Sequence, residues 1–478
     1  MDVLEADSKL NLPRMVARLA YPVALSRLFQ ALVGIIDIAM VGGLGAAATA
    51  AVGTGRQLVF ISEMMMISVI SGAMAITAQV GGQGSGYAVT TVLRHAFLVL
   101  LVFSLVLGAL GYLATPWLLH LVGAQGEVFT AGVEYMHIFF AGLWAMALSH
   151  IIVNIMQASG DTLTPLFIVA AINILHIAGN YVFINGLGII PAMGVRGAAL
   201  GQVASRFVGL LLGLAIVYSG AYRINMRTET SLKLEWSLLR RIFRIGLPIT
   251  MQGLSRNGAA VVLLRVISGT PAATVGLAAF AIGSRLSQFA FFGANAFSTV
   301  ALILVGQSLG AGQSKEAETR GWVTLRFSLV LMSIIGLFFF FFAEPLVTFF
   351  SDDPAVIASG TLFVRLLAIA QPFIAMTQAL SGALQGAGDT RPPLYYTLIA
   401  QWFFSIPLAY LLSFTFDFGV IGVWIAVTIS PILQGVLTTN KYRSGSWKQH
   451  YARGAMPLHP IPVTTHVVPI GGSNEQDK

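Results

Sequence analysis

The chain has 478 residues, of which 56% are hydrophobic and only 10% are charged, and its mean hydropathy is +0.82. A soluble globular domain usually carries about 25% charged residues, so this composition excludes an ordinary soluble fold and is typical of a protein embedded in lipid. The formal net charge of +8 raises the question of nucleic-acid binding, while the absence of cysteine excludes disulfides and thiolate metal sites.

Long apolar runs recur along the whole chain and predict its secondary structure. They are continuous rather than alternating, which excludes the strands of a transmembrane β-barrel. A run of about 20 apolar residues crosses a bilayer as a helix, in which every backbone hydrogen bond closes internally. We therefore expect an all-α polytopic membrane protein with 12 transmembrane helices. Their expected extents are residues 15–41, 51–80, 92–115, 129–156, 164–186, 195–219, 240–268, 274–306, 320–343, 355–384, 393–413 and 419–439.

The basic residues of the connections fall on alternate sides of this predicted bundle. Every second connection carries Lys9, Arg14, Arg94, Arg223, Arg227, Lys233, Arg240, Arg241, Arg244, Lys315, Arg320, Arg391, Lys441, Arg443, Lys448 and Arg453. The intervening connections carry no lysine or arginine, although Arg56 and Arg196 lie just inside spans near that face. By the positive-inside rule we expect both termini in the cytoplasm and the chain in the plasma (cell inner) membrane. Topology and lipid headgroups then account for the positive charge, and we expect no nucleic-acid partner.

The first span carries a proline and a carboxylate. Pro22 removes one helical hydrogen bond and gives the helix a place to bend. Asp37 lies in the outer half of the span, with no lysine or arginine within a helical turn. A carboxyl group in a low-dielectric interior can take up a proton near neutral pH and release it when hydrated. We expect Asp37 to couple an ion to a bend at Pro22; the alternative is a structural role in capping or helix pairing.

The second span places Glu63 two helical turns after Arg56, on the same face. An ion pair within or between helices is the first interpretation of Glu63, and recognition of a substrate cation is the second. Met64 and Met65 follow directly, and Phe292 lies in the eighth span. Soft, repackable side chains suit a promiscuous cavity, although such residues also pack between helices or face lipid.

The fifth span contains Asn173, His176 and Asn180, which recur at helical spacing and share one face. Their structural interpretation is hydrogen bonding between helices. Histidine has an unperturbed pKa of about 6.5, which suits proton exchange with a carboxylate such as Asp37. In the second half, Arg256, Arg265 and Arg285 lie within apolar spans. They either pair with the acids of the first half or contact an anionic substrate, and the sequence leaves this choice open.

Two stretches show that the chain is an internal repeat. Gln157–Leu166 and Gln385–Leu394 are identical at six of ten positions, at an offset of 228 residues. Each contains Gly-Asp-Thr, in which Gly suits a left-handed helix end and Asp or Thr suits the cap of the next helix. Two halves of six spans each enter the membrane in the same orientation, so a pseudo-two-fold axis along the membrane normal is expected to relate them. The expected parts are an N-lobe (1–219), a cytoplasmic loop (220–239), a C-lobe (240–450) and a disordered cytoplasmic tail (451–478).

From about Pro13 to Asn440 the chain resembles the multidrug and toxic compound extrusion (MATE) family. The similarity rests on "YPVALSRLFQALVGIIDIAMVGGLG", "QASGDTLTPLF", "NYVFINGLGIIPAMGVRGAALG" and "GALQGAGDTRPPLYY", in this order and within a 6+6 repeat. The resemblance implies a V-shaped pair of six-helix lobes around a central cavity. It also implies export of organic, often cationic, amphipathic compounds by alternating access, in exchange for inward H⁺ or Na⁺.

The resemblance further implies roles for particular residues. An aspartate at the position of Asp37 is the N-lobe coupling residue of the family. Family members often carry an acid where Asn180 stands and an amide where His176 stands, and both changes weaken a sodium site, which favours H⁺. Some sodium-coupled members have a glutamate where Arg256 stands, so a C-lobe ion site is not expected. The candidate cavity residues are Gln30, Glu63, Met64, Met65, Arg256, Arg285 and Phe292.

Other functions remain as alternatives. They are a Na⁺-coupled exporter of the same family, a flippase for lipid-linked intermediates with a related two-lobed topology, and a major-facilitator transporter. The last usually has a basic loop motif after the second span, which "GGQGSGYAVTT" lacks. An enzyme is not expected, because there is no Walker loop, nucleophile constellation or metal-ligand cluster. We expect a monomer in the lipid bilayer that handles small organic substrates, with no cofactor beyond its coupling ion.

Overall fold

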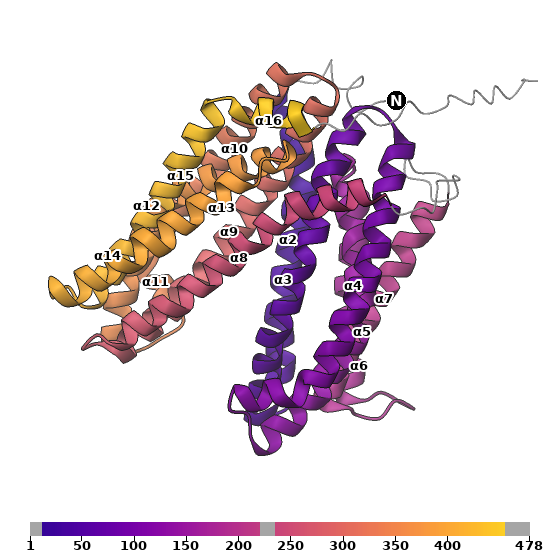
Figure 1. Cartoon of the computed structure of the whole chain (residues 1–478). Coiled ribbons are helices and arrows are strands. Elements are labelled where there is room, and N and C mark those ends of the chain that lie inside the picture. Colours follow the sequence, from indigo (N-terminus) through magenta and orange to yellow (C-terminus); the bar gives the residue numbers. More distant parts are fainter. Residues whose placement is uncertain (1–11, 220–234, 455–478) are drawn as a thin grey trace, which may run out of the picture.

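The computed structural model describes residues 12–219 and 235–454, and within these residues no strand forms (Figure 1). The N-terminal half contains α2 (Leu12–Gly42), α3 (Ala46–Gly82), α4 (Gly86–Leu121), α5 (Gly126–Ala158), α6 (Leu163–Asn185) and α7 (Gly194–Tyr218). The C-terminal half contains α8 (Trp236–Ser268), α9 (Ala273–Gly310), α10 (Ser314–Phe341), α11 (Ala343–Thr348), α12 (Pro354–Gly386), α13 (Arg391–Leu398), α14 (Ile406–Tyr410), α15 (Val420–Arg443) and α16 (Ser446–Gly454). Two π-helical segments, η2 (Ile399–Ser405) and η3 (Leu411–Thr415), flank α14.

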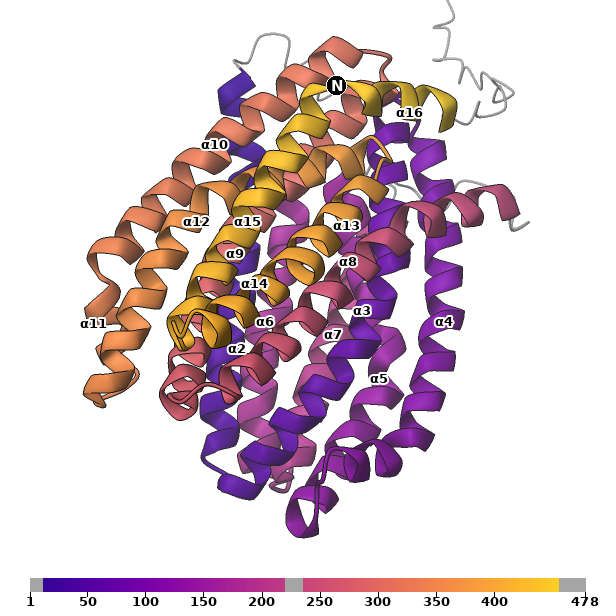
Figure 2. The same cartoon turned by 60° about the vertical axis from the view of Figure 1, so that its left-hand side comes forward.

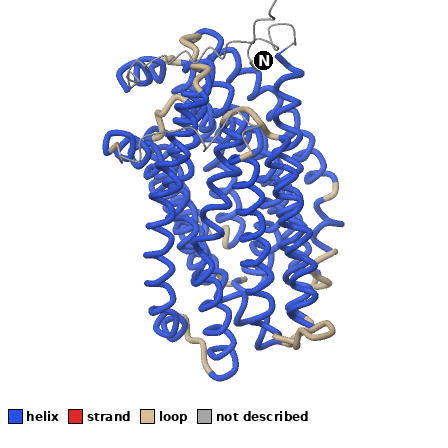
Figure 3. The backbone as a smooth tube through the Cα atoms, turned by 90° about the vertical axis from the view of Figure 1, so that its right-hand side faces the viewer, coloured by secondary structure: helices blue, strands red, loops and turns tan. Residues whose placement is uncertain are grey.

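The two halves form separate lobes that converge at one end and splay apart at the other (Figure 1). We call the end at which α2 begins and α16 lies the closed end, and the opposite end the open end. In the two turned views the helices of both lobes run between these ends, and most connecting loops gather at them (Figures 2 and 3). The predicted all-α fold of two six-helix lobes is therefore confirmed.

The helix bounds follow the expected spans to within a few residues. Eleven helical segments of the described chain are long and apolar enough to cross a membrane. The twelfth, α8, is less apolar because it carries five arginines. Of the expected inter-lobe loop, residues 220–234 lie outside the described residues, and α8 already begins at Trp236. The expected disordered tail also lies outside them, apart from residues 451–454, which belong to α16.

The eleventh span differs from a regular helix. Residues 391–415 form one rod in which α-helical turns alternate with the wider turns of η2 and η3. Pro407 is the second residue of α14 and has no N–H to donate, and its ring clashes with the preceding turn of a regular helix. A wider turn before a proline relieves that clash, so the π-helical segment η2 has a local cause.

The internal repeat is visible as a reciprocal contact at the closed end. Gln79 Nε2 donates to Gly386 O at 2.8 Å, and Gln307 Nε2 is 3.5 Å from Ala158 O. Both pairs are related by the repeat offset of 228 residues. Gly82 packs against the Gln307 backbone and Gly310 against the Gln79 backbone, so closely that neither has room for a Cβ atom. Each of these contacts from the N-lobe to the C-lobe thus has a counterpart from the C-lobe to the N-lobe between the equivalent residues. A two-fold relation between the lobes produces such reciprocal contacts.

The Gly-Asp-Thr stretches form the expected turns. Gly160 has φ 101° and Gly388 has φ 80°, the left-handed region that favours glycine. Asp161 Oδ1 accepts the backbone N–H groups of Leu163 and Thr164 at 2.9 and 3.0 Å and so caps α6. In the second half Asp389 instead forms an ion pair with Lys441 at 3.2 Å. These stretches are therefore equivalent turns of the two halves, in which the chain reverses direction between α5 and α6 and between α12 and α13.

Candidate functional site

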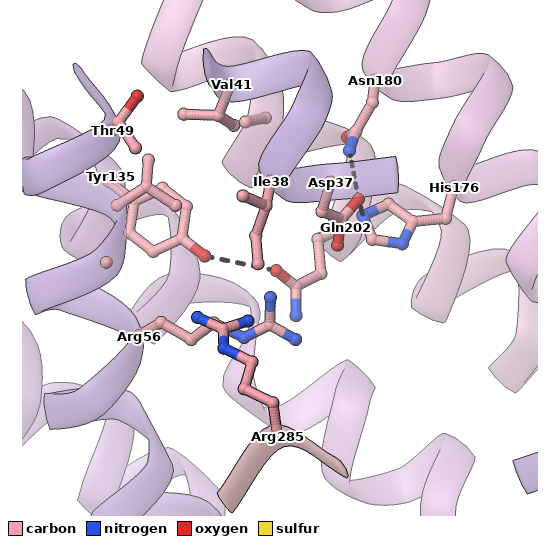
Figure 4. Close-up of a pocket in the computed structure, with 13 residues that line it drawn as sticks. Asp37, Ile38, Val41, Thr49, Arg56, Tyr135, His176, Asn180, Gln202 and Arg285 are labelled. Carbon is pink, nitrogen blue, oxygen red and sulfur yellow. Dashed lines mark hydrogen bonds and ion pairs between the residues drawn. The ribbon is translucent and has the colours of Figure 1, made fainter. Parts of the chain in front are cut away.

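Asp37 lies near the open end of α2 and faces α6, which supplies both of its close polar neighbours. Asn180 Nδ2 donates to Asp37 Oδ1 at 2.9 Å, and His176 Nε2 lies 3.5 Å from the same oxygen (Figure 4). His176 and Asn180 are one helical turn apart, so they reach the carboxylate from one face of α6. The Asp37 side chain is 17% exposed. The structure thus brings Asp37 together with two residues of α6, of which Asn180 lies 143 residues further along the sequence.

Asn173 lies two turns before Asn180 on α6 and does not contact Asp37. It is buried, and its Nδ2 has no hydrogen-bond partner among the described residues. It lines the large cavity described below. Pro22 is buried in α2, five residues before Arg27, and its carbonyl accepts the hydroxyl of Ser26 at 2.8 Å. The helix is continuous through this position.

Two adjoining cavities lie between the lobes, mostly against the N-lobe. The larger has a volume of about 570 Å³ and is lined by α2, α3, α5, α6 and α7, with α8, α9 and α12 on the other side. The smaller, of about 230 Å³, lies toward the open end. Both are lined by Asp37, Arg56, Tyr135, His176 and Gln202. The carboxylate of Asp37 is therefore accessible from both cavities.

The sequence-predicted cavity residues divide into two groups. Gln30, Glu63, Met64 and Phe292 line the larger cavity, and Arg285 lines the smaller one. Met65 is 40% exposed and lines neither.

Arg256 also lines neither cavity. Its guanidinium lies over the ring of Phe291, 5.2 Å from the ring centroid. Glu63, for which an ion pair was expected, has no basic group within 4 Å among the described residues.

Several lining residues were missed by the sequence analysis. Arg27 of α2 and Arg206 of α7 line the larger cavity, as do Tyr135 and Gln202, whose side chains hydrogen bond at 3.4 Å. A signal for the two arginines was present, because each lies in the middle of an apolar span, where a charge requires a cavity or a partner. Tyr135 and Gln202 carry no comparable signal, since polar uncharged residues are frequent in such helices.

Comparison with known proteins gives three consistent findings. A family model named MatE matches twice, at residues 22–182 and 248–411. The probable multidrug resistance protein NorM of Thermotoga maritima is 28% identical over 90% of this chain and 92% of its own length. A solved structure described as MATE in the bent conformation has a TM-score of 0.84, with 20% identity, over 92% of this chain and 98% of that one. One described as MATE in the straight conformation also has a TM-score of 0.84, with 20% identity, over 92% and 97%.

Proposed function

Because the chain belongs to the MATE family, as the twofold match to the family model shows, we propose that it is a secondary antiporter that exports organic compounds in exchange for H⁺. It is a multi-pass membrane transporter of the two-lobed type. The NorM relative is named for multidrug resistance, which supports export of more than one compound. Alternating access then requires that the lobes open in turn at each end.

The environment of Asp37 is the observation that carries the choice of H⁺. The near neighbours of its carboxylate are an amide N–H and an imidazole nitrogen. A hard cation such as Na⁺ requires several oxygen ligands, which these donors do not provide. No guanidinium lies within 4 Å of the carboxylate among the described residues, so no close ion pair with an arginine holds it in the charged form. Protonation replaces an anion by a neutral group and changes the hydrogen bonds between α2 and α6.

The distribution of basic residues supports an orientation with the closed end in the cytoplasm. Arg391 begins α13, Lys441 lies in the last turn of α15 and Lys448 lies in α16, all at the closed end (Figure 1). Arg241 lies there too, because it hydrogen bonds to Gln79. In this orientation both termini are cytoplasmic, and the V opens to the outside of the plasma membrane. We propose that a monomer suffices, because the cavities lie within one chain, and that H⁺ is the one inorganic species it requires.

The proposal is tested by dye uptake into everted membrane vesicles with an acidic lumen. The same vesicles without the protein correct for passive accumulation. We expect a pH gradient to drive uptake of an organic dye, either rhodamine 6G or fluorescein, in the wild type. Asp37→Asn should reduce uptake to the level of vesicles without the protein, because the amide cannot exchange a proton.

A matched control is Glu134→Gln, which removes a carboxylate that is paired with Arg196 at 2.7 Å and lies outside both cavities. It should transport like the wild type. Equal pH-driven uptake by Asp37→Asn and the wild type would contradict the role of Asp37. Uptake driven only by a sodium gradient would contradict coupling to H⁺.

A further inference from the structure

The two adjoining cavities carry more positive than negative charge. Four arginines line them, namely Arg27, Arg56, Arg206 and Arg285. The described residues that line the same space include only two carboxylates, Asp37 and Glu63. Even with both acids ionised, an excess of two positive charges faces the cavity. The family resemblance implies substrates that are often cationic, and this surface would repel them.

Arg56 and Arg285 come from opposite lobes and point toward one another. Arg56 belongs to α3 of the N-lobe and Arg285 to α9 of the C-lobe, and both side chains extend into the smaller cavity (Figure 4). The guanidinium of Arg56 lies over α2, where Nη2 would be 3.8 Å from a Cβ atom added to Gly34. No carboxylate lies within 4 Å of either guanidinium among the described residues.

The two remaining arginines extend the same pattern into the larger cavity. Arg27 Nη1 hydrogen bonds to Gln30 Oε1 at 3.3 Å, a neutral partner from its own helix. Arg206 has no carboxylate within 4 Å among the described residues, although it shares the cavity with Glu63. Both side chains are half-buried. Charged groups held in a membrane interior usually pair with an opposite charge or mark a binding pathway.

The existing acids do not remove the charge excess. Asp37 is already held by Asn180 and His176 on α6. Glu63 lies seven residues after Arg56 on α3, about 10 Å along the axis, which is too far for a close pair within that helix. A ligand that supplies the missing negative charge would offset the repulsion between the guanidinium groups. The planar fork of arginine matches the oxygens of a carboxylate, sulfonate or phosphate.

We propose that the cavities bind amphipathic organic compounds that carry an anionic group, and that Arg56 and Arg285 hold this group from opposite lobes. The proposal rests on the proposed export function and names its substrate class. Phe292, Met64 and Tyr135 supply the apolar part of the site. An anion between Arg56 and Arg285 bridges the lobes, so binding favours closure of the open end. Closure is the first step that alternating access requires.

The test compares two dyes built on one xanthene ring system, fluorescein as the anion and rhodamine 6G as the cation. Fluorescence polarisation on the purified full-length protein measures the affinity for each dye. We expect the wild type to bind fluorescein more tightly. Arg56→Gln and Arg285→Gln should each weaken fluorescein binding by about ten- to a hundredfold, the loss of a hydrogen-bonded charge pair. Arg285→Glu should reverse the preference between the dyes.

Arg265→Gln is the matched control, because Arg265 is an exposed arginine of α8 that lines neither cavity. It should bind fluorescein like the wild type. Size-exclusion chromatography and thermal melting check that each variant is folded. If a variant does not fold, the proposal is tested instead by competition of small ions with fluorescein for binding to the wild-type protein. Naphthalene-1-sulfonate should displace fluorescein, and 1-naphthylmethylammonium should not.

The inference is overturned if rhodamine 6G binds more tightly than fluorescein, if both arginine variants keep wild-type affinity for fluorescein, or if the two naphthalene compounds compete equally. Its failure can be distinguished from failure of the proposed function. pH-driven uptake of rhodamine 6G alone would retain proton-coupled export and reject the anionic substrate class. If fluorescein binding depends on the arginines but a pH gradient drives no uptake, the anionic substrate class is retained and proton-coupled export is rejected.

Discussion

At the residue scale, the contact between Asn180 and Asp37 determines how easily the carboxylate changes its charge. The Asn180 amide donates a hydrogen bond to Asp37 Oδ1 and therefore favours the ionised form. Asn180→Ala removes this donor. We expect the pH profile of transport in vesicles to move to higher pH by about one unit, since a hydrogen bond to a charged group contributes about 1.5–3 kcal/mol.

The control for this prediction is Asn185→Ala on the same helix. Asn185 is exposed, and its Nδ2 donates to Tyr181 O at 3.1 Å within α6. Its loss should leave the pH profile unchanged. A profile for Asn180→Ala that is unchanged, or that moves to lower pH, would show that the hydrogen bond does not stabilise the charged carboxylate.

The identities of the main site residues could be predicted from the sequence, whereas their contacts with one another could not. Asp37 and the shared face of His176 and Asn180 were predicted, because an acid within an apolar span and a helical spacing are visible in the chain itself. Their mutual contact was not fixed by that pattern, since it depends on how α2 packs against α6. The opposition of Arg56 and Arg285 was also hidden, because it arises from packing between lobes. In both cases the missing information is tertiary.

At the scale of elements, Pro22 divides α2 into a part near the closed end and a part that carries Asp37. A proline in a helix leaves the carbonyl four residues earlier, that of Arg18, without its usual donor. In Pro22→Ala that hydrogen bond can form, which favours the straight helix by about 3 kcal/mol. We expect slower pH-driven dye uptake and an equal or higher melting temperature.

Pro116→Ala is the matched control for the bend in α2. Pro116 also lies inside an N-lobe helix, α4, but is exposed and lines neither cavity. It should not slow transport. Uptake by Pro22→Ala at the wild-type rate would show that bending at this proline is not part of the transport cycle.

Helices were easier to predict than their irregularities. The span at residues 391–415 was expected from its apolar length, and that expectation holds. The π-helical segments within it were not expected, because a nearly continuous apolar run has no periodicity that distinguishes α-helical from π-helical turns. Pro407 was the available signal, and it indicates a disturbance in the helix without specifying its form.

At the scale of the whole molecule, the two lobes meet at the closed end through the Gln79 and Gln307 side chains. Each amide reaches across to a backbone carbonyl of the other lobe, and Arg241 Nη2 donates to Gln79 Oε1 at 2.6 Å. Both glutamine side chains are buried in this state, and Arg241 is half-buried. Opening the closed end breaks these contacts, so they contribute to the preference for a V that is open at the other end.

The double variant Gln79→Ala/Gln307→Ala removes both amides and should shift the population toward opening of the closed end. The chain has no cysteine, so a pair of introduced cysteines can carry spin labels without a background signal from native cysteines. Gln83 and Gln313 are exposed and lie in the corresponding turns of the two lobes. Labels at these positions should report a longer and broader distance distribution in the double variant. Gln125→Ala, at the open end, should leave the distribution unchanged.

The reciprocity of the contact makes the prediction more specific. Because Gln79 and Gln307 occupy equivalent positions of the repeat, each single variant should produce a part of the shift. The Gln79 variant should have the larger effect, since Gln79 contacts both Gly386 and Arg241, whereas Gln307 makes one long hydrogen bond. If the double variant keeps the wild-type distances, the close backbone packing between the lobes, which includes that of Gly82 and Gly310, is sufficient to hold them together. The amides then play no part in setting which end is open.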